Sequence, residues 1–120
     1  MLQPLFVLAF PRLYAQSGEK SDAGFHSLEP SFKRLMVYLF VAMRGGGNRT
    51  KIVELLRREP SNANRIAEVV GLDYKTVRHH LRLLEENEVI VASPKETYGT
   101  VYFLSSYVDQ HFEALKALWA

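Results

Sequence analysis

The segment from residue 62 to residue 84, NANRIAEVVGLDYKTVRHHLRLL, predicts two helices joined by a tight turn, and it constrains the fold more than any other part of the chain. Gly71 stands where a helix end needs a residue that tolerates positive φ. Asp73 can accept backbone N–H bonds as the N-cap of the second helix. Apolar residues recur at helical spacing in both halves, so each helix should bury one face. We expect these faces to consist of Ile66, Ala67, Val69 and Val70 in the first helix and Tyr74, Val77, Leu81 and Leu84 in the second.

The outward side of the second predicted helix is basic. Lys75, Arg78, His79 and Arg82 recur at i, i+3, i+4 and i+7, so they share one face. Basic residues are ordinary on any helix surface. Here, however, no acid stands between Lys75 and Arg82, and the preceding turn suits a DNA recognition helix. We expect Arg78 and His79 to reach base edges, Lys75 and Thr76 to lie near phosphates, and Arg82 to contact the DNA backbone.

The stretch GLDYKTVRHHLRLLEENEVI, with the hairpin-like stretch after it, resembles the helix-turn-helix and wing of ArsR-type winged-helix regulators, most closely their small archaeal relatives. The resemblance extends over roughly Ser31 to Ala120, and TVRHHLRLL is its most specific part. It implies a winged helix, usually dimeric, that binds double-stranded DNA at promoters. Family wings often carry more positive charge than PKETYG, in which Glu96 offsets Lys95, so Lys95 and Tyr98 are the best candidates for wing contacts.

The remaining periodicities predict a mainly α fold with a small β wing, a winged helix-turn-helix with a three-helix core plus a C-terminal helix. An apolar helix should start near Pro30 and end at the glycines of residues 45–47, and Asn48 can cap the next helix. From residue 89 the apolar period changes to two, with turn residues at 94–99, which predicts a wing of two or three strands.

The N-terminal part has a different composition. Residues 1–24 should form an apolar arm and a polar linker, QSGEKSDAG, and residues 25–120 the winged helix-turn-helix domain. The apolar run from Leu5 to Phe10 is too short to span a membrane and lacks the preceding basic residues of a secretory signal. We favour an arm that packs on the domain or on a second subunit. A cleaved signal and a misassigned upstream start codon are the alternatives.

Two predicted helices carry more apolar surface than a domain of this size can bury alone. The first is apolar over more than half its circumference, and the last has apolar residues at spacings of four, three and four, typical of a helix that packs on a partner helix. Together they predict a homodimer that places two recognition helices on an inverted repeat. The interface candidates are Phe32, Leu35, Met36, Leu39, Val108, Phe112, Leu115 and Trp119.

Positive charge is concentrated around the predicted helix-turn-helix. The formal net charge is only +2, but residues 44–82 hold nine Lys or Arg against four Asp or Glu, and residues 85–120 hold two against six. Clustered positive charge is what binding to DNA phosphates requires. Arg49, Lys51 and Arg65 are placed for such contacts. The full set of DNA-binding candidates is Lys51, Arg65, Asp73, Tyr74, Lys75, Thr76, Arg78, His79, Arg82, Lys95 and Tyr98.

Metal binding and catalysis find little support in the sequence. Without cysteine the chain forms neither disulfides nor thiolate zinc sites, which fits a reducing cytoplasm. Asp109 and His111 resemble half of a zinc site of the family, so we expect no metal and no cofactor. His80 lies beside apolar residues and should pack as a structural histidine. No catalytic spacing is recognisable, and GGGNRTK lacks the pattern of a phosphate-binding loop, so we do not expect an enzyme.

The sequence therefore predicts a sequence-specific regulator of transcription that binds double-stranded DNA as a dimer. The alternative is a winged helix that uses the same basic face to bind an acidic protein of the transcription machinery. Salt dependence separates the two, because several phosphate contacts make duplex binding fall steeply with salt.

Overall fold

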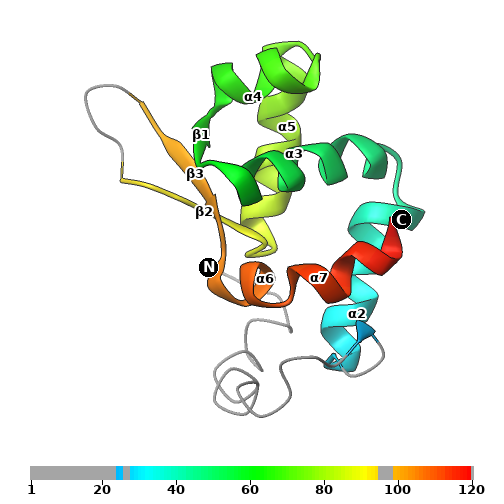
Figure 1. The fold of residues 1–120 in the computed structure, drawn as a ribbon. Helices are drawn as coiled ribbons and strands as arrows, with labels where there is room; N and C mark the ends of the chain where they lie inside the picture. Colours follow the sequence, from blue (N-terminus) through cyan, green and yellow to red (C-terminus); the bar gives the residue numbers. More distant parts are fainter. Residues whose placement is uncertain (1–23, 26–27, 95–98, 120) are drawn as a thin grey trace.

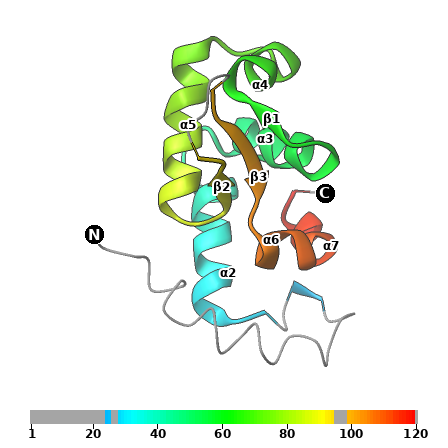
Figure 2. The same ribbon diagram turned by 90° about the vertical axis from the view of Figure 1, so that its left-hand side faces the viewer.

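The computed structural model describes residues 24–25, 28–94 and 99–119. A helical body carries a small antiparallel sheet that projects from one side (Figure 1; Figure 2), which confirms the predicted winged helix-turn-helix. Within these residues, no helix combines the length and the apolar character needed to cross a membrane.

The helices and strands follow one another along the chain in this order. The elements are α2 (Pro30–Val37), the π-helix η2 (Tyr38–Ala42), α3 (Gly46–Arg58), β1 (Ser61–Asn62), α4 (Ala63–Val70), α5 (Tyr74–Glu86), β2 (Ile90–Ala92), β3 (Val101–Leu104), α6 (Ser106–Gln110), α7 (Phe112–Leu115) and the 3₁₀-helix η3 (Lys116–Leu118).

The helix-turn-helix consists of α4 and α5. Gly71 ends α4 at φ 83°, a left-handed conformation in which a side chain would strain the backbone. Asn62 caps α4 and Asp73 caps α5, each by accepting a backbone N–H bond from three residues ahead. Two expectations about the buried faces are wrong: Val69 is 42% exposed and Tyr74 is 51% exposed. Both side chains therefore lie largely outside the buried faces of their helices.

The wing is a three-stranded antiparallel sheet with the strand order β1-β3-β2. β2 and β3 form the predicted hairpin, in which Ala92 lies opposite Tyr102, and β1 adds a short third strand from the loop before α4. Because strand side chains alternate, Tyr102 is buried while Phe103 is exposed. The wing candidates Lys95 and Tyr98 lie outside the described residues.

The first predicted helix is divided into α2 and η2. The carboxylate of Glu29 caps α2 by accepting the backbone N–H bond of Phe32 at 3.0 Å. The π-helix η2 follows directly and ends at Met43, whose backbone N–H donates to the carbonyl of Tyr38 at 3.0 Å. The widely apolar helix is therefore present, but its second half is wound more loosely than an α-helix.

The connection between η2 and α3 depends on glycine. Gly45 adopts φ 87°, and α3 begins at Gly46 rather than after an Asn48 cap as predicted. A Cβ atom on Gly46 would lie 2.4 Å from the carbonyl oxygen of Phe40. Residue 46 must therefore be glycine, because two backbones approach each other here more closely than a side chain allows.

The C-terminal segment is broken at His111 into α6, α7 and η3, where one continuous helix was expected. These helices lie beside α2 (Figure 1). The ring of Tyr107 meets Phe32 edge-on with centroids 4.8 Å apart, and Trp119 lies 5.2 Å from Phe40. The apolar stripe of the C-terminal segment is therefore covered by the subunit's own first helix.

This packing corrects the predicted partner surface. The apolar faces of α2, η2 and the C-terminal helices cover one another within the subunit, so most of the predicted interface residues belong to its core. Only Leu35 and Trp119 remain partly exposed. The residues that move from the interface to the core are Phe32, Met36, Leu39, Val108, Phe112 and Leu115.

Candidate nucleic-acid interface

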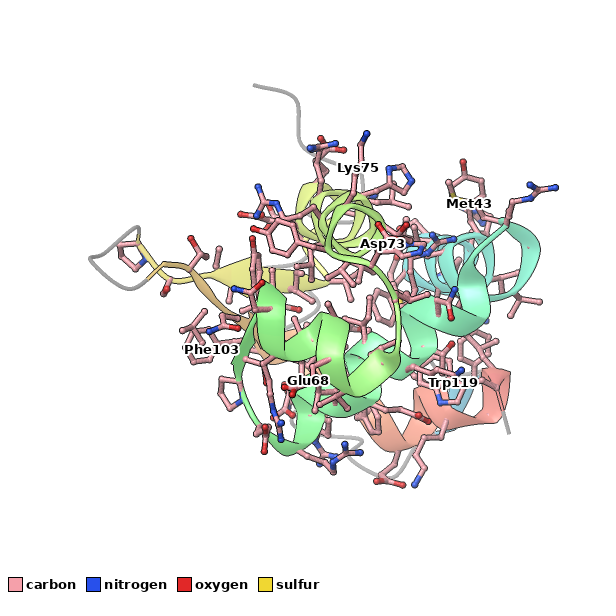
Figure 3. The ribbon with its side chains drawn as sticks, turned by 90° about the horizontal axis from the view of Figure 1, so that it is seen from above. Met43, Glu68, Asp73, Lys75, Phe103 and Trp119 are labelled. Carbon is pink, nitrogen blue, oxygen red and sulfur yellow. The ribbon has the colours of Figure 1, made fainter. Side chains whose placement is uncertain are left out.

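The basic face of α5 is exposed along its length. Lys75, Arg78, His79 and Arg82 are all exposed, while the opposite face of the helix is buried. Lys75 points away from the body of the molecule (Figure 3). Within the described ranges, none of the salt bridges involves these four residues. The positive charges of Lys75, Arg78 and Arg82 are therefore available to an anion.

The N-terminus of α5 is held by two hydrogen bonds that Thr76 donates to Asp73. The backbone N–H of Thr76 donates to one carboxylate oxygen of Asp73 at 3.0 Å, and its hydroxyl donates to the other at 2.6 Å. Hydrogen bonds from Thr76 hold the pKa of Asp73 below its ordinary value. Both side chains position the start of the helix, and direct contact with DNA stays a prediction for them.

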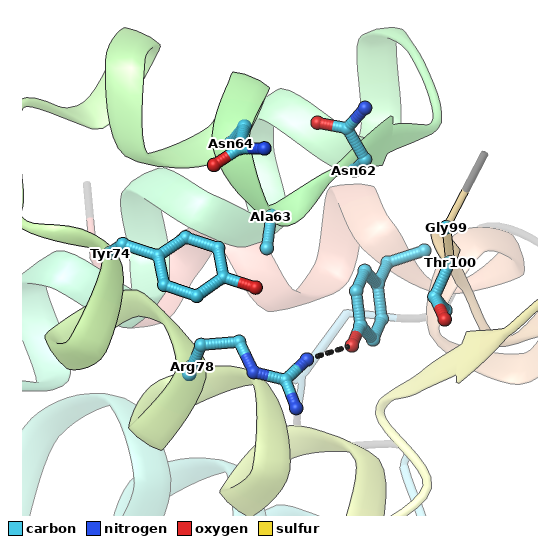
Figure 4. Close-up of a pocket in the computed structure, with 8 residues that line it drawn as sticks. Asn62, Ala63, Asn64, Tyr74, Arg78, Gly99 and Thr100 are labelled. Atoms are coloured by element: carbon cyan, nitrogen blue, oxygen red, sulfur yellow. Dashed lines mark hydrogen bonds between the residues drawn. The ribbon is translucent and has the colours of Figure 1, made fainter.

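Arg78 is turned toward the wing. Its Nη1 donates a hydrogen bond of 3.0 Å to the hydroxyl of Tyr102 on β3 (Figure 4). Tyr102 is only 4% exposed, so its ring is anchored between the sheet and the helices. Around this bond the N-terminus of α4, the first turns of α5 and the start of β3 enclose a hollow of about 270 Å³. It is lined by Asn62, Ala63, Asn64, Tyr74, Arg78, Gly99, Thr100 and Tyr102.

Sequence reasoning missed most of the residues around this hollow. The alternation in the last strand indicates that Tyr102 faces the helices, but it does not indicate which helical residue the hydroxyl meets. Asn62 and Asn64 carry no signal beyond a helix start. Their approach to Arg78 depends on how the wing folds back on α5, which local patterns do not encode.

Behind α5, Arg49 and His80 form a buried polar pair. Nη1 of Arg49 lies 3.0 Å from Nδ1 of His80, while its Nε and Nη2 donate to the carbonyl oxygens of Leu39 and Arg44, each at 2.8 Å. Burial, followed by the nearby Arg49 charge, lowers the pKa of His80 below its ordinary value, so the neutral ring accepts the bond. The phosphate contact expected of Arg49 is wrong because the side chain is 0% exposed. The packed, structural His80 is confirmed.

Lys51 and Arg65, the other two cations that flank the basic face of α5, differ in whether an acid offsets their charge. Lys51 is exposed and stays a candidate. Arg65 pairs with Glu59 at 3.2 Å and with Glu68 at 3.6 Å, which offsets its charge. Glu68 and Lys75 lie on opposite sides of the helix-turn-helix (Figure 3). This arrangement opposes the phosphate contact predicted for Arg65.

Asp109 and His111, the two candidates for half of a zinc site, contact different neighbours. Asp109 pairs with Arg57 at 2.8 Å, and that guanidinium also lies over the ring of Phe112, 4.8 Å from its centroid. The His111 ring packs 4.3 Å from the Tyr107 ring, and burial lowers the pKa of His111. In the part of the chain that the structure describes, no group of three or more His, Asp or Glu side chains is arranged to hold a metal ion.

Residues 47–91, which extend from α3 through α5 into β2, match the family of bacterial regulatory proteins called the arsR family. The likeness to the arsR family is confined to this segment, which covers less than half of the chain. The matched segment contains the whole basic face of α5, with the cap that starts this helix and the Arg49–His80 pair behind it. No curated protein matches the chain.

Several solved structures are similar to this chain, and those with the higher TM-scores share its winged-helix fold. The homodimeric DNA-binding domain Mb0332 of Mycobacterium bovis, a possible ArsR-family regulator, is 19% identical, with a TM-score of 0.56 over 77% of this chain and 86% of that one. ZitR of Lactococcus lactis, a zinc-responsive MarR family member, is 20% identical, with a TM-score of 0.51 over 92% and 74% of the two chains. The Zalpha domain of Carassius auratus PKZ, solved with Z-DNA, is 30% identical over 52% and 98%, with a TM-score of 0.47.

Proposed function

We propose that this protein is a transcription regulator that binds double-stranded DNA sequence-specifically, with α5 as its recognition helix. The observation that carries the proposal is the exposed and acid-free basic face formed by Lys75, Arg78, His79 and Arg82. A helix anchored by one face and basic on the other is how a helix-turn-helix enters the major groove. The family of bacterial regulatory proteins that matches this segment supports the same function. We also propose a cytoplasmic location, since the cysteine-free sequence fits a reducing compartment.

We propose further that the regulator is a homodimer. Val37, Tyr38 and Val41 form an exposed apolar strip on α2 and η2, with exposed fractions of 37%, 53% and 55%. Val37 and Tyr38 also line an open, mostly apolar groove together with Phe25. Contiguous apolar surface on so small a domain is typical of an interaction site. The similar Mycobacterium bovis domain is described as homodimeric, which supports a second copy as the occupant.

Selection of bound duplexes from a random library tests the proposal. We expect recovery of an inverted repeat, because a two-fold dimer presents two recognition helices to two half-sites. Affinity for that duplex should fall steeply as salt rises, since each contacted phosphate releases counterions. Lys75→Ala should lower the slope, whereas Lys116→Ala, which removes a cation on η3 that pairs with Glu113, should leave it unchanged.

The alternative function is a winged helix that binds an acidic protein. In that case the selection would recover no motif, and duplex binding would be weak and non-saturating. A single conserved half-site without a repeat would support DNA recognition but contradict the dimer.

A further inference from the structure

The hollow beside Arg78 has the chemistry of an anion site. Its polar side chains are the guanidinium of Arg78, the hydroxyls of Tyr74, Thr100 and Tyr102 and the amides of Asn62 and Asn64, and among the described residues no carboxylate lines it. The carbonyl oxygen of the Asn62 side chain accepts the backbone N–H bond of Arg65 at 2.8 Å. The Asn62 amide group is therefore left with its two N–H donors.

Arg78 is held in place before any ligand arrives. Its bond to the hydroxyl of Tyr102 uses Nη1, and among the described contacts no other hydrogen bond occupies the remaining N–H donors of the guanidinium. Tyr102 is nearly fully buried, so the hydroxyl is a fixed anchor rather than a mobile surface group. A guanidinium held in one orientation loses less side-chain entropy on binding and suits the bidentate recognition of phosphate.

The hollow is continuous with the basic face of α5. Tyr74 and Arg78 belong both to its lining and to the exposed side of α5. A DNA backbone that runs from the recognition helix toward the wing would pass this position. Lys75 and His79, in contrast, have no such hydrogen bond to the wing among the described contacts.

Resting on the proposed function, we propose that this hollow binds one phosphate of the DNA backbone, with Arg78 as its principal ligand and Tyr102 as the residue that positions Arg78. The sequence alone favours Arg78 as a base-reading residue. The structure assigns Arg78 to the affinity and register of DNA binding, and leaves base reading to His79. Asn62, Asn64 and Tyr74 donate further hydrogen bonds to the same phosphate.

The test combines protein variants with duplexes in which single phosphates are replaced by uncharged methylphosphonates. Arg78→Ala should weaken binding roughly tenfold on the selected duplex and on unrelated duplexes alike, since a charge-assisted hydrogen bond is lost. The slope of log affinity against log salt should fall by about one. At one methylphosphonate position the effect of Arg78→Ala should disappear, because the contacted charge is already absent.

Tyr102→Phe and Lys116→Ala complete the design. Tyr102→Phe keeps the buried ring and removes only the anchor, so it should give a smaller loss that disappears at the same methylphosphonate position. Lys116→Ala should change neither affinity nor slope. Circular dichroism of each variant establishes that it is folded.

Two results would overturn the assignment in distinguishable ways. If Arg78→Ala relaxes preference at one base pair while the salt slope and every methylphosphonate effect stay unchanged, Arg78 reads a base and only the phosphate site is wrong. If the wild-type chain binds no duplex at any salt concentration, the proposed function and the phosphate site are both wrong.

Discussion

Nη1 of Arg49 on α3 lies 3.0 Å from Nδ1 of His80 on α5, and both side chains are buried. The same guanidinium bonds the carbonyl oxygens of Leu39 in η2 and Arg44 in the following turn. A Cβ atom on Gly45 would approach Cε1 of His80 to 2.8 Å, so the turn must carry glycine to let the pair form. The Arg49 side chain thus connects α5 to η2, the helix that borders the proposed dimer surface.

Replacing Arg49 should destabilise the whole domain. Arg49→Ala removes the guanidinium donor from two backbone carbonyls and one imidazole nitrogen, and an unsatisfied acceptor costs about 1–3 kcal/mol where it is buried, as at Leu39 and His80. We expect the free energy of unfolding to fall by at least about 3 kcal/mol in urea titrations. Arg49→Lys should recover only part of the loss, because one ammonium cannot reproduce the planar fork. Arg58→Ala, an exposed cation on the same helix, should change stability by less than about 0.5 kcal/mol.

The same pair predicts acid sensitivity. The pKa of His80 is lower in the folded chain than in the unfolded chain, through burial and then through the charges of Arg49 and His79. As pH falls below about 6.5, the unfolded chain takes up a proton that the folded chain resists, so the free energy of unfolding decreases. His80→Asn keeps an acceptor for Arg49 but does not titrate. Between pH 7 and pH 5 its stability should therefore depend less on pH than that of the wild type.

His79→Gln is the matched control for this prediction, because it removes an exposed imidazole from the same helix. Because the charge of His79 is the smallest of the three causes that lower the pKa of His80, the stability of His79→Gln should stay more dependent on pH than that of His80→Asn. His111, whose pKa burial also lowers, contributes to the remaining acid sensitivity in every variant. An unchanged pH dependence in His80→Asn would show that the buried pair does not titrate against folding.

The helix-turn-helix could be predicted from sequence because its signals are local. Gly71 and Asp73 each act within a few residues of their position, and the periodicity around them places Val77 and Leu81 in the core. The exposed basic face follows from the same periodicity. These features depend on no distant part of the chain.

The errors arise where burial depends on the tertiary fold. From sequence, an arginine near the start of a helix is predicted to be an exposed cation. Arg49 is buried only because η2 and α5 pack against it in the folded chain. The apolar stripe ending at Trp119 was read as a partner surface, since spacing shows that a helix face is covered but not by what. Likewise, only the folded wing brings the Tyr102 hydroxyl to Arg78.

The salt dependence of DNA binding should distinguish Lys75 from Arg65. Lys75 is exposed on α5 and forms no salt bridge among the described residues, so Lys75→Ala should lower the salt slope by about one. Arg65 is paired with Glu59 and Glu68, and Arg65→Ala should change the slope by much less. Equal effects of the two variants would restore the phosphate contact first expected of Arg65.

The proposed dimer should depend on the exposed strip of α2 and η2 and not on the buried C-terminal stripe. Val41 is 55% exposed, so Val41→Glu should leave the subunit folded and shift sedimentation toward the monomer by placing a charge in the apolar interface. Its affinity for the inverted repeat should fall more than its affinity for one half-site, because linked binding is lost rather than a DNA contact. Val69→Glu, on an exposed valine of α4, should leave the dimer intact.

Leu115→Ala, in the buried C-terminal stripe, should instead destabilise each subunit by about 2–5 kcal/mol, since that side chain is 0% exposed. A wild-type chain that sediments as a monomer at every concentration that binds DNA would remove the dimer and the inverted repeat with it.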